Sequence, residues 1–169
     1  MKICVCGDVH WSQYSSILRK RCETHSLRLE NLVESINWVE DTAARAMCDV
    51  VVMLGDFFDS SHLNAEEISA LQHIVWSNIS HVFITGNHET TVSNLDYSTA
   101  DLFNLCPNSR VISKPEQYVM GDTDYELCFL PYILERDRKC IAEYFSAPTR
   151  RRIIFSHNDL KDVNYGNFV

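Results

Sequence analysis

The first 85 residues alternate between short apolar runs and segments with helical periodicity, and this alternation restricts the fold more than any other feature. The apolar runs are residues 2–6, 50–54 and 81–85. The run at 50–54 is unbroken and rich in β-branched side chains, which is typical of a strand covered on both faces. Helical spacing of apolar residues over 29–47, and again from the candidate N-cap Asn64 to Val75, predicts two helices. The order β-α-β-α-β predicts helices that cross over a mostly parallel sheet.

The second half of the chain predicts a different arrangement. Short helices are expected near residues 95–105 and 135–146. Strands are expected at 110–113, 117–120, 126–130 and 152–155. The short connections between the first three of these strands favour antiparallel pairing and a second sheet. The chain is therefore predicted to have an α/β fold.

The size and composition of the chain predict one cytoplasmic domain over residues 1–169. No apolar run approaches the roughly 20 residues of a membrane helix, and the apolar N-terminal stretch is too short for a signal peptide, so no membrane partner is expected. The seven cysteines are scattered and odd in number, which favours reduced thiols. A net charge of −8 argues against a broad DNA clamp. It does not exclude an enzyme that meets nucleic acid at a cleft filled with cations.

Polar residues capable of binding metal ions or transferring protons follow each strong strand. The four segments are Gly7-Asp8-Val9-His10, Gly55-Asp56 through Asp59, Gly86-Asn87-His88-Glu89 and Ser156-His157-Asn158-Asp159. Ligands bind at the carboxyl ends of strands in open α/β sheets, so these segments are expected to converge. Glycine before the polar residue permits a sharp turn.

The residue types in these segments predict a site for two divalent metal ions. Asp56 can bridge both ions, Asp8 and His10 could complete one site, and Asn87 and His157 the other. Imidazole and oxygen ligands suit Mn²⁺, Fe²⁺ or Zn²⁺, and Mg²⁺ less well. Two such ions exceed the charge of the two carboxylates, and this surplus suits a phosphate group and a bound hydroxide.

Two further sets of residues are candidates for contact with substrate. His88 lies beside Asn87 and is the candidate general acid or transition-state stabiliser. Arg19, Lys20 and Arg21 follow the first ligand pair and could contact a phosphate backbone, although a solvated loop explains them equally well.

The pattern resembles that of the calcineurin-like metallophosphoesterases over nearly the whole chain. The blocks that carry the resemblance are Asp8-Val9-His10, Asp56 through Asp59, and Asn87-His88-Glu89. The resemblance implies an α/β/β/α sandwich with two central mixed sheets flanked by helices. It also implies two divalent ions, Mn²⁺ above all, with the ligand assignments given above and His88 as the catalytic histidine.

Within that family, the chain most resembles the nuclease subunit of SbcCD-type DNA repair and recombination exonucleases from bacteria or phages. The stretches concerned are "GDVHW", "LGDFFD" and "SHNDLKDVNYGNF". The resemblance implies DNA and an SMC-like ATPase as partners. The alternatives are a phosphatase or nucleotide phosphodiesterase of the same superfamily, or a non-catalytic relative whose metal-binding edge serves only as a scaffold.

One block of the family pattern has no counterpart in the sequence. The family's Gly-His-x-His block should follow His157, and no histidine lies beyond that residue. The domain is therefore expected to be C-terminally incomplete, without the capping and ATPase-binding regions. On this view the chain alone would bind Mn²⁺ weakly and would associate with a second copy or with a complementing C-terminal segment.

Overall fold

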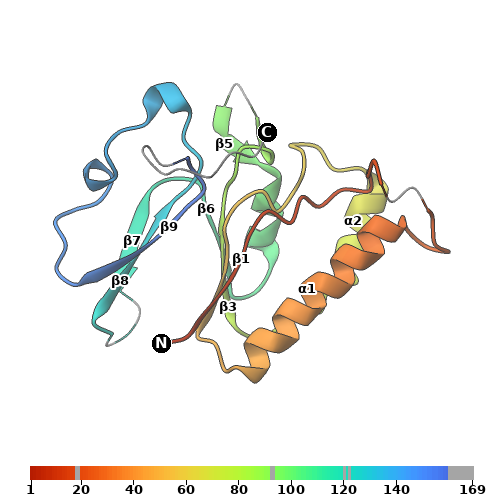
Figure 1. Ribbon diagram of the computed structural model, residues 1–169, viewed down its shortest axis with the longest axis horizontal. Coiled ribbons are helices and arrows are strands. Elements are labelled where there is room, and N and C mark those ends of the chain that lie inside the picture. Colours follow the sequence, from red (N-terminus) through yellow and green to blue (C-terminus); the bar gives the residue numbers. More distant parts are fainter. Residues whose placement is uncertain (18–19, 92–93, 120, 122, 160–169) are drawn as a thin grey trace.

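The computed structural model describes residues 1–17, 20–91, 94–119, 121 and 123–159, and it has the predicted α/β fold. Two sheets pack face to face, and two α-helices cover the outer face of the larger one (Figure 1). The helices are α1 (Leu27–Arg45) and α2 (Ala65–Leu71). The strands are β1 (Ile3–Cys6), β2 (Val50–Met53), β3 (Ser80–Ile84), β4 (Thr90–Thr91), β5 (Asn94–Ser98), β6 (Ser109–Ile112), β7 (Glu116–Val119), β8 (Tyr125–Leu130) and β9 (Arg151–Ser156).

The larger sheet has the strand order β1-β2-β3-β6, and all three of its pairings are parallel. Its two faces differ in what covers them. Alternate side chains of β2, such as Val51 and Met53, pack with Leu29 and Ile36 of α1, whereas Val50 and Val52 face the smaller sheet. Both faces of β2 are therefore buried, as its unbroken apolar sequence predicts.

The smaller sheet has the order β7-β8-β9 and is mixed: β7 and β8 pair antiparallel, and β8 and β9 pair parallel. Phe129 and Phe155 stack at the interface between the two sheets, with ring centroids 5.3 Å apart. On the other face of this sheet, Phe145 packs against Cys128 and Leu130. The parallel pairing of β9 brings its carboxyl end, and therefore His157, to the same side of the molecule as the ends of β1 to β3.

The elements expected at 95–105, 110–113 and 135–146 differ from the structure. The region expected to be a helix at 95–105 is strand β5 followed by the 3₁₀ helix η1 (Thr99–Leu105), whose N-cap is Ser98. The strand expected at 110–113 is β6, which pairs parallel with β3 instead of antiparallel within the second sheet. Of the strand expected at 117–120, Met120 lies outside the described residues.

The helix expected at 135–146 is replaced by two short 3₁₀ helices, η2 (Glu135–Asp137) and η3 (Ile141–Glu143). Arg138 separates them because its backbone is extended, with φ −70° and ψ 136°. The outer layer over the smaller sheet is therefore built from turns, and Arg138 lies in an irregular segment between two of them.

Helix α2 ends at Leu71, four residues before the predicted end at Val75. Asn37 of α1 explains the early end, because its side chain donates to His73 O at 3.2 Å and accepts from the Val75 amide at 2.7 Å. These bonds replace the helical bonds that would continue α2. Among the described helices, none is both long and apolar enough to cross a membrane.

Candidate metal centre

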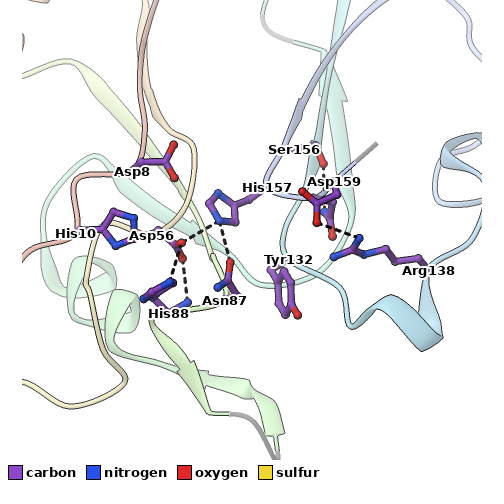
Figure 2. A pocket seen from close by; sticks show the side chains of 11 residues that line it. Asp8, His10, Asp56, Asn87, His88, Tyr132, Arg138, Ser156, His157 and Asp159 are labelled. Atoms are coloured by element: carbon purple, nitrogen blue, oxygen red, sulfur yellow. Dashed lines mark hydrogen bonds and ion pairs between the residues drawn. The ribbon is translucent and has the colours of Figure 1, made fainter. Parts of the chain in front are cut away.

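The strand-end segments predicted to converge line one pocket. Asp8, Asp56 and Asn87 follow the adjacent parallel strands β1, β2 and β3, and His157 follows β9 of the smaller sheet. The His157 amide donates to Leu130 O at 3.2 Å, and its ring lies against the end of β2. His10 and His88 complete the group of predicted site residues around the pocket (Figure 2).

Three of these residues have left-handed backbone conformations. The φ angles are 53° at Asp8, 49° at His10 and 48° at Asp56. A non-glycine residue in this region costs roughly 1–3 kcal/mol, and such residues cluster at functional sites. The conformation turns the chain sharply as each strand ends, so that the side chains face the pocket.

Two glycines make room for the side chains at the centre of the site. A Cβ atom at Gly86 would overlap the Oδ1 atom of Asp56. Gly55 has φ 92°, and a Cβ atom there would lie 2.6 Å from the His157 ring. Any larger residue at either position would displace Asp56 or His157, which explains why glycine precedes both strand-end segments.

The ligand atoms form two groups that share Asp56. One group is Asp8, Asp56 and His157, and the other is His10, Asp56 and His88, with all ligand atoms of a group within 4.8 Å of one another. Asn87 adjoins the first group, because its Oδ1 lies 3.2 Å from His157 Nε2. The shared position of Asp56 is the one expected of a bridging ligand.

The grouping differs from the pairs expected from the sequence. Asp8 was expected to act with His10, but it lies with His157, while His10 lies with His88 at a ring-centroid distance of 4.8 Å. Both Asp8 and His10 have left-handed backbones, and both line the same pocket in groups that share Asp56.

Hydrogen bonds orient two of the imidazole rings toward the pocket. Nδ1 of His157 donates to Leu54 O at 2.7 Å, and Nδ1 of His10 lies 2.9 Å from Asp59 Oδ1. In each ring, a partner at Nδ1 leaves Nε2 as the ligand atom, which is the usual outer-shell arrangement around metal-binding histidines. The donor set therefore fits divalent ions in its orientation as well as its chemistry.

Asp56 is buried but is held in its ionised form. Burial raises the pKa of its carboxyl group, but the hydrogen bond from His157 and the bond from the His88 amide at 3.0 Å outweigh it, so the pKa lies below the ordinary value. The group needed to bridge two cations is thus a carboxylate around neutral pH.

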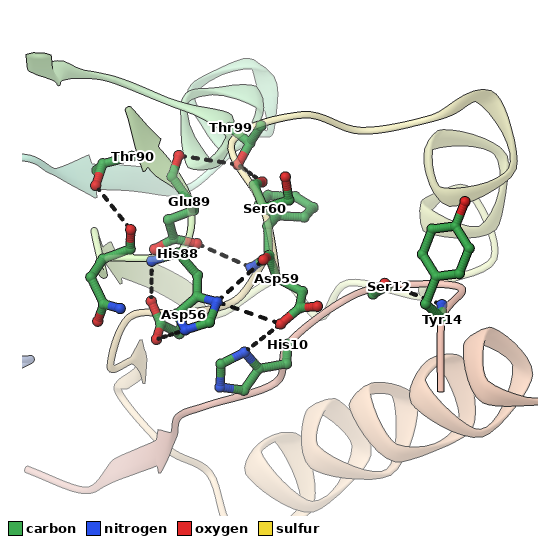
Figure 3. Close-up of polar contacts among 12 residues, drawn as sticks. His10, Ser12, Tyr14, Asp56, Asp59, Ser60, His88, Glu89, Thr90 and Thr99 are labelled. Atoms are coloured by element: carbon green, nitrogen blue, oxygen red, sulfur yellow. Dashed lines mark hydrogen bonds and ion pairs between the residues drawn. The ribbon is translucent and has the colours of Figure 1, made fainter. Parts of the chain in front are cut away.

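Two residues of the site were not assigned roles from the sequence, although both belong to its blocks. Asp59 contacts both His10 and His88: its backbone carbonyl lies 3.2 Å from His88 Nδ1, and its carboxylate lies 3.6 Å from the same atom (Figure 3). Glu89 is fully buried beneath the site. Its carboxylate accepts from the Gly86 amide at 2.7 Å and from the Phe58 amide at 3.1 Å. Glu89 therefore ties the segment after β2 to the segment after β3.

Glu89 gives the metal-free protein a specific pH dependence. Burial is the largest influence and raises the pKa of Glu89 to about 7 from 4.5, against the two amide bonds that lower it. Between these pH values the native state retains a proton that the unfolded chain has released. The free energy of unfolding should therefore fall as the pH rises through this range, by up to about 3 kcal/mol. We expect Glu89→Gln to remove most of this slope.

Urea unfolding of the chelator-treated protein at about pH 5 and about pH 7 measures this effect. Glu34→Gln is the matched control, because Glu34 is an exposed residue of α1. Glu89→Gln should also be less stable than the wild type at the lower pH, since an amide cannot accept from two N–H groups on separate oxygens. An unchanged slope in Glu89→Gln would show that Glu89 does not titrate in this range.

Of the basic residues predicted to contact substrate, the two that the structure describes, Lys20 and Arg21, do not line the pocket. Arg19 lies outside the described residues. Arg21 pairs with Glu66 at 3.0 Å, and Lys20 is exposed. Their contact with a phosphate backbone stays a prediction. The pocket instead contains one arginine that the sequence analysis did not single out, Arg138.

A parallel sheet with carboxylate, imidazole and amide groups gathered at its carboxyl edge defines a metal-dependent hydrolase of phosphate esters. Comparison with known proteins agrees with this class. The model of the calcineurin-like phosphoesterases matches residues 1–167, and the chain belongs to that family. Membership implies two divalent metal ions at the site, and the two donor groups that share Asp56 fit them.

The comparisons with curated proteins and with solved structures add no finer assignment within the family. No curated protein matches the chain. Among solved structures, a dimetal phosphatase from Danio rerio is similar, with 12% identity and a TM-score of 0.44. The similarity covers 76% of this chain and 43% of that one, so the chain spans less than half of the length of this solved structure.

Proposed function

We propose that the protein hydrolyses phosphodiester bonds in DNA with the aid of two divalent metal ions. The observation that carries the proposal is the shared position of Asp56 between two donor groups, with His88 beside it. When bound at such a site, the ions supply a nucleophile from water and polarise the phosphate group. Mn²⁺ is the ion that we expect, because the donors are imidazole, carboxylate and amide groups without thiolate.

The residues around the pocket have separate tasks in this proposal. Asp8, Asp56, His10, Asn87 and His157 hold the ions. His88 acts on the leaving oxygen: its Nδ1 bonds to Asp59 O at 3.2 Å, which leaves Nε2 directed toward the pocket, 4.0 Å from Asp56 Oδ2. The protonated ring can donate from Nε2 as the bond to the leaving group breaks. Asp59 keeps His10 and His88 in these orientations.

DNA is favoured as the substrate by the blocks that resemble the SbcCD-type nucleases and by the size of the pocket. The cavity has a volume of about 480 Å³, which exceeds the needs of a phosphate group and leaves room for its substituents. The formal charge of −8 disfavours binding along an extended surface, so contact with DNA is expected mainly at the metal centre. An SMC-like ATPase partner belongs to the same proposal.

Cleavage of an end-labelled DNA duplex in the presence of Mn²⁺ tests the proposal. We expect cleavage with Mn²⁺, none after chelation, and recovery when Mn²⁺ is returned. p-Nitrophenyl phosphate is assayed in parallel, because a phosphatase would hydrolyse this monoester and leave the duplex intact. That result would replace the nuclease with a phosphatase, while the metal-dependent chemistry would stand.

A further inference from the structure

The pocket continues beyond the two donor groups to a wall formed by the connection that follows β8. Tyr132 and Arg138 line this wall, and in Figure 2 they lie beyond His157 and Asn87 as seen from His10. Neither residue belongs to a donor group. The cavity therefore joins a region that can hold the reacting phosphate to a second region with a different chemistry, an aromatic ring and a guanidinium group.

The guanidinium of Arg138 is held in place but is weakly neutralised. Its Nε donates to Ile133 O at 2.9 Å, and its side chain is only 24% exposed. Among the described residues, Arg138 forms an ion pair with Asp159, whose carboxylate lies 3.8 Å from the guanidinium. Asp159 is 88% exposed, and an ion pair of that length with an exposed partner is weak. A preorganised guanidinium of this kind is suited to a phosphate, which it can bind through two parallel hydrogen bonds.

Tyr132 is fixed relative to the metal centre by its backbone. Its amide donates to Thr85 O at 2.8 Å, and Thr85 lies directly between the end of β3 and Gly86. The Arg138 guanidinium lies over one face of the Tyr132 ring, with its Cζ 5.8 Å from the ring centroid. An aromatic ring that lines an open pocket next to a cation offers a stacking surface for a nucleobase.

We propose that Tyr132 and Arg138 form a subsite for the nucleotide that adjoins the scissile phosphate. Arg138 binds the next phosphate along the strand, and Tyr132 stacks against a base. The inference rests on the proposed function, and it goes further by placing a second phosphate of the DNA strand and an adjoining base at named side chains of the pocket. p-Nitrophenyl phosphate has no second phosphate for Arg138 to bind.

Binding of a fluorescently labelled single-stranded oligonucleotide is followed by anisotropy with Mn²⁺ present, and every variant carries His88→Ala so that the oligonucleotide is not cut; the measurement gives the contribution of each side chain. Arg138→Gln and Tyr132→Leu should each weaken binding about 10-fold, because loss of one stacking contact or one phosphate contact has effects of this order. Tyr132→Phe should bind as tightly as the wild type, because the ring remains. In Arg138→Gln, the salt dependence should also fall by about 0.7 in its logarithmic slope.

Arg136→Gln is the matched control, because Arg136 lies two residues from Arg138 and is 79% exposed, outside the pocket. It should leave binding and cleavage unchanged. Arg138→Lys keeps the charge and loses the planar fork, and we expect a loss smaller than that of Arg138→Gln. Arg138→Lys and the two Tyr132 variants keep the proposal testable if Arg138→Gln fails to fold.

Substrate modification locates the phosphate that Arg138 contacts. Single phosphates of the oligonucleotide are replaced in turn by neutral methylphosphonates, and kcat/KM is compared for wild type and Arg138→Gln. In the wild type, one position next to the cut should reduce kcat/KM about 10-fold, and in Arg138→Gln the same replacement should have little further effect.

The two proposals fail in different ways. If the wild type cuts DNA and Arg138→Gln matches Arg136→Gln at every position, the subsite is absent and the nuclease function stands. If the wild type hydrolyses p-nitrophenyl phosphate but neither binds nor cuts DNA, the proposed nuclease function is overturned and the subsite falls with it.

Discussion

Asp56→Asn is expected to remove both metal-binding events and to abolish hydrolysis. Asp56 is the only described residue in both donor groups, and its carboxylate is the anion between them. A neutral amide cannot supply that charge to two cations. Because loss of an outer-shell partner alone costs about 10–100-fold in metal affinity, loss of the shared ligand should cost more than about 100-fold. Asparagine tolerates left-handed backbone conformations, so the φ of 48° should be preserved.

Calorimetric titration with MnCl₂, together with hydrolysis measured at saturating substrate, tests this prediction. Asp8→Asn is the informative comparison, because Asp8 belongs to one group and its loss should weaken one binding event. Asp41→Asn serves as the control for a change of one charge, since Asp41 is exposed on α1 and pairs with Arg45. Normal Mn²⁺ binding by Asp56→Asn would exclude a bridging role.

His88→Ala should reduce kcat by about 10²–10⁴-fold and leave binding of Mn²⁺ largely intact. His88 is assigned to the leaving oxygen, and its Nδ1 is bonded to the backbone of Asp59. Measurement of metal binding is decisive here, because His88 is itself one of the three residues of the second donor group, with His10 and Asp56. A general acid and a ligand differ in this measurement, since only loss of a ligand lowers the affinity of the protein for Mn²⁺.

His62→Ala is the matched control for His88→Ala, because His62 is an exposed histidine that bonds to Ser61 outside the pocket. Turnover and Mn²⁺ affinity are measured on the same preparations. A parallel loss of Mn²⁺ affinity would place His88 among the ligands, and unchanged turnover would remove it from catalysis.

Sequence periodicity predicted strands β1 to β3 of the larger sheet and helix α1 well, because local and tertiary preferences agree there. The buried run at 50–54 and the amphipathic pattern at 29–47 became β2 and α1 with small changes of boundary. The residues of the site could be found in the same way. Polar residues after glycine at the ends of buried strands have few structural uses, and adjacent parallel strands bring their ends together.

The features that the sequence did not reveal depend on contacts between distant residues. The parallel pairing of β6 with β3 is not encoded in the local pattern of β6, which fits either sheet. The helix expected at 135–146 is interrupted at Arg138, whose Nε bonds to Ile133 O while its backbone stays extended. The left-handed conformations of Asp8 and His10 leave no signal in the sequence, because neither residue is a glycine.

The two walls of the pocket belong to different parts of the chain, and this division has an evolutionary consequence. The donor groups lie on strand ends where a change of one residue disturbs an ion, a backbone turn or the carboxylate of Glu89. Tyr132 and Arg138 lie on one connection after β8, which bonds to Thr85 through the Tyr132 amide and to Asn158 through Pro131 O and the Ile133 amide. On the proposed assignment, substrate preference could change by exchange of this one connection while the strand ends that carry the donor groups stay the same. Grafting residues 131–140 onto a related hydrolase would then be expected to transfer the preference and not the reaction.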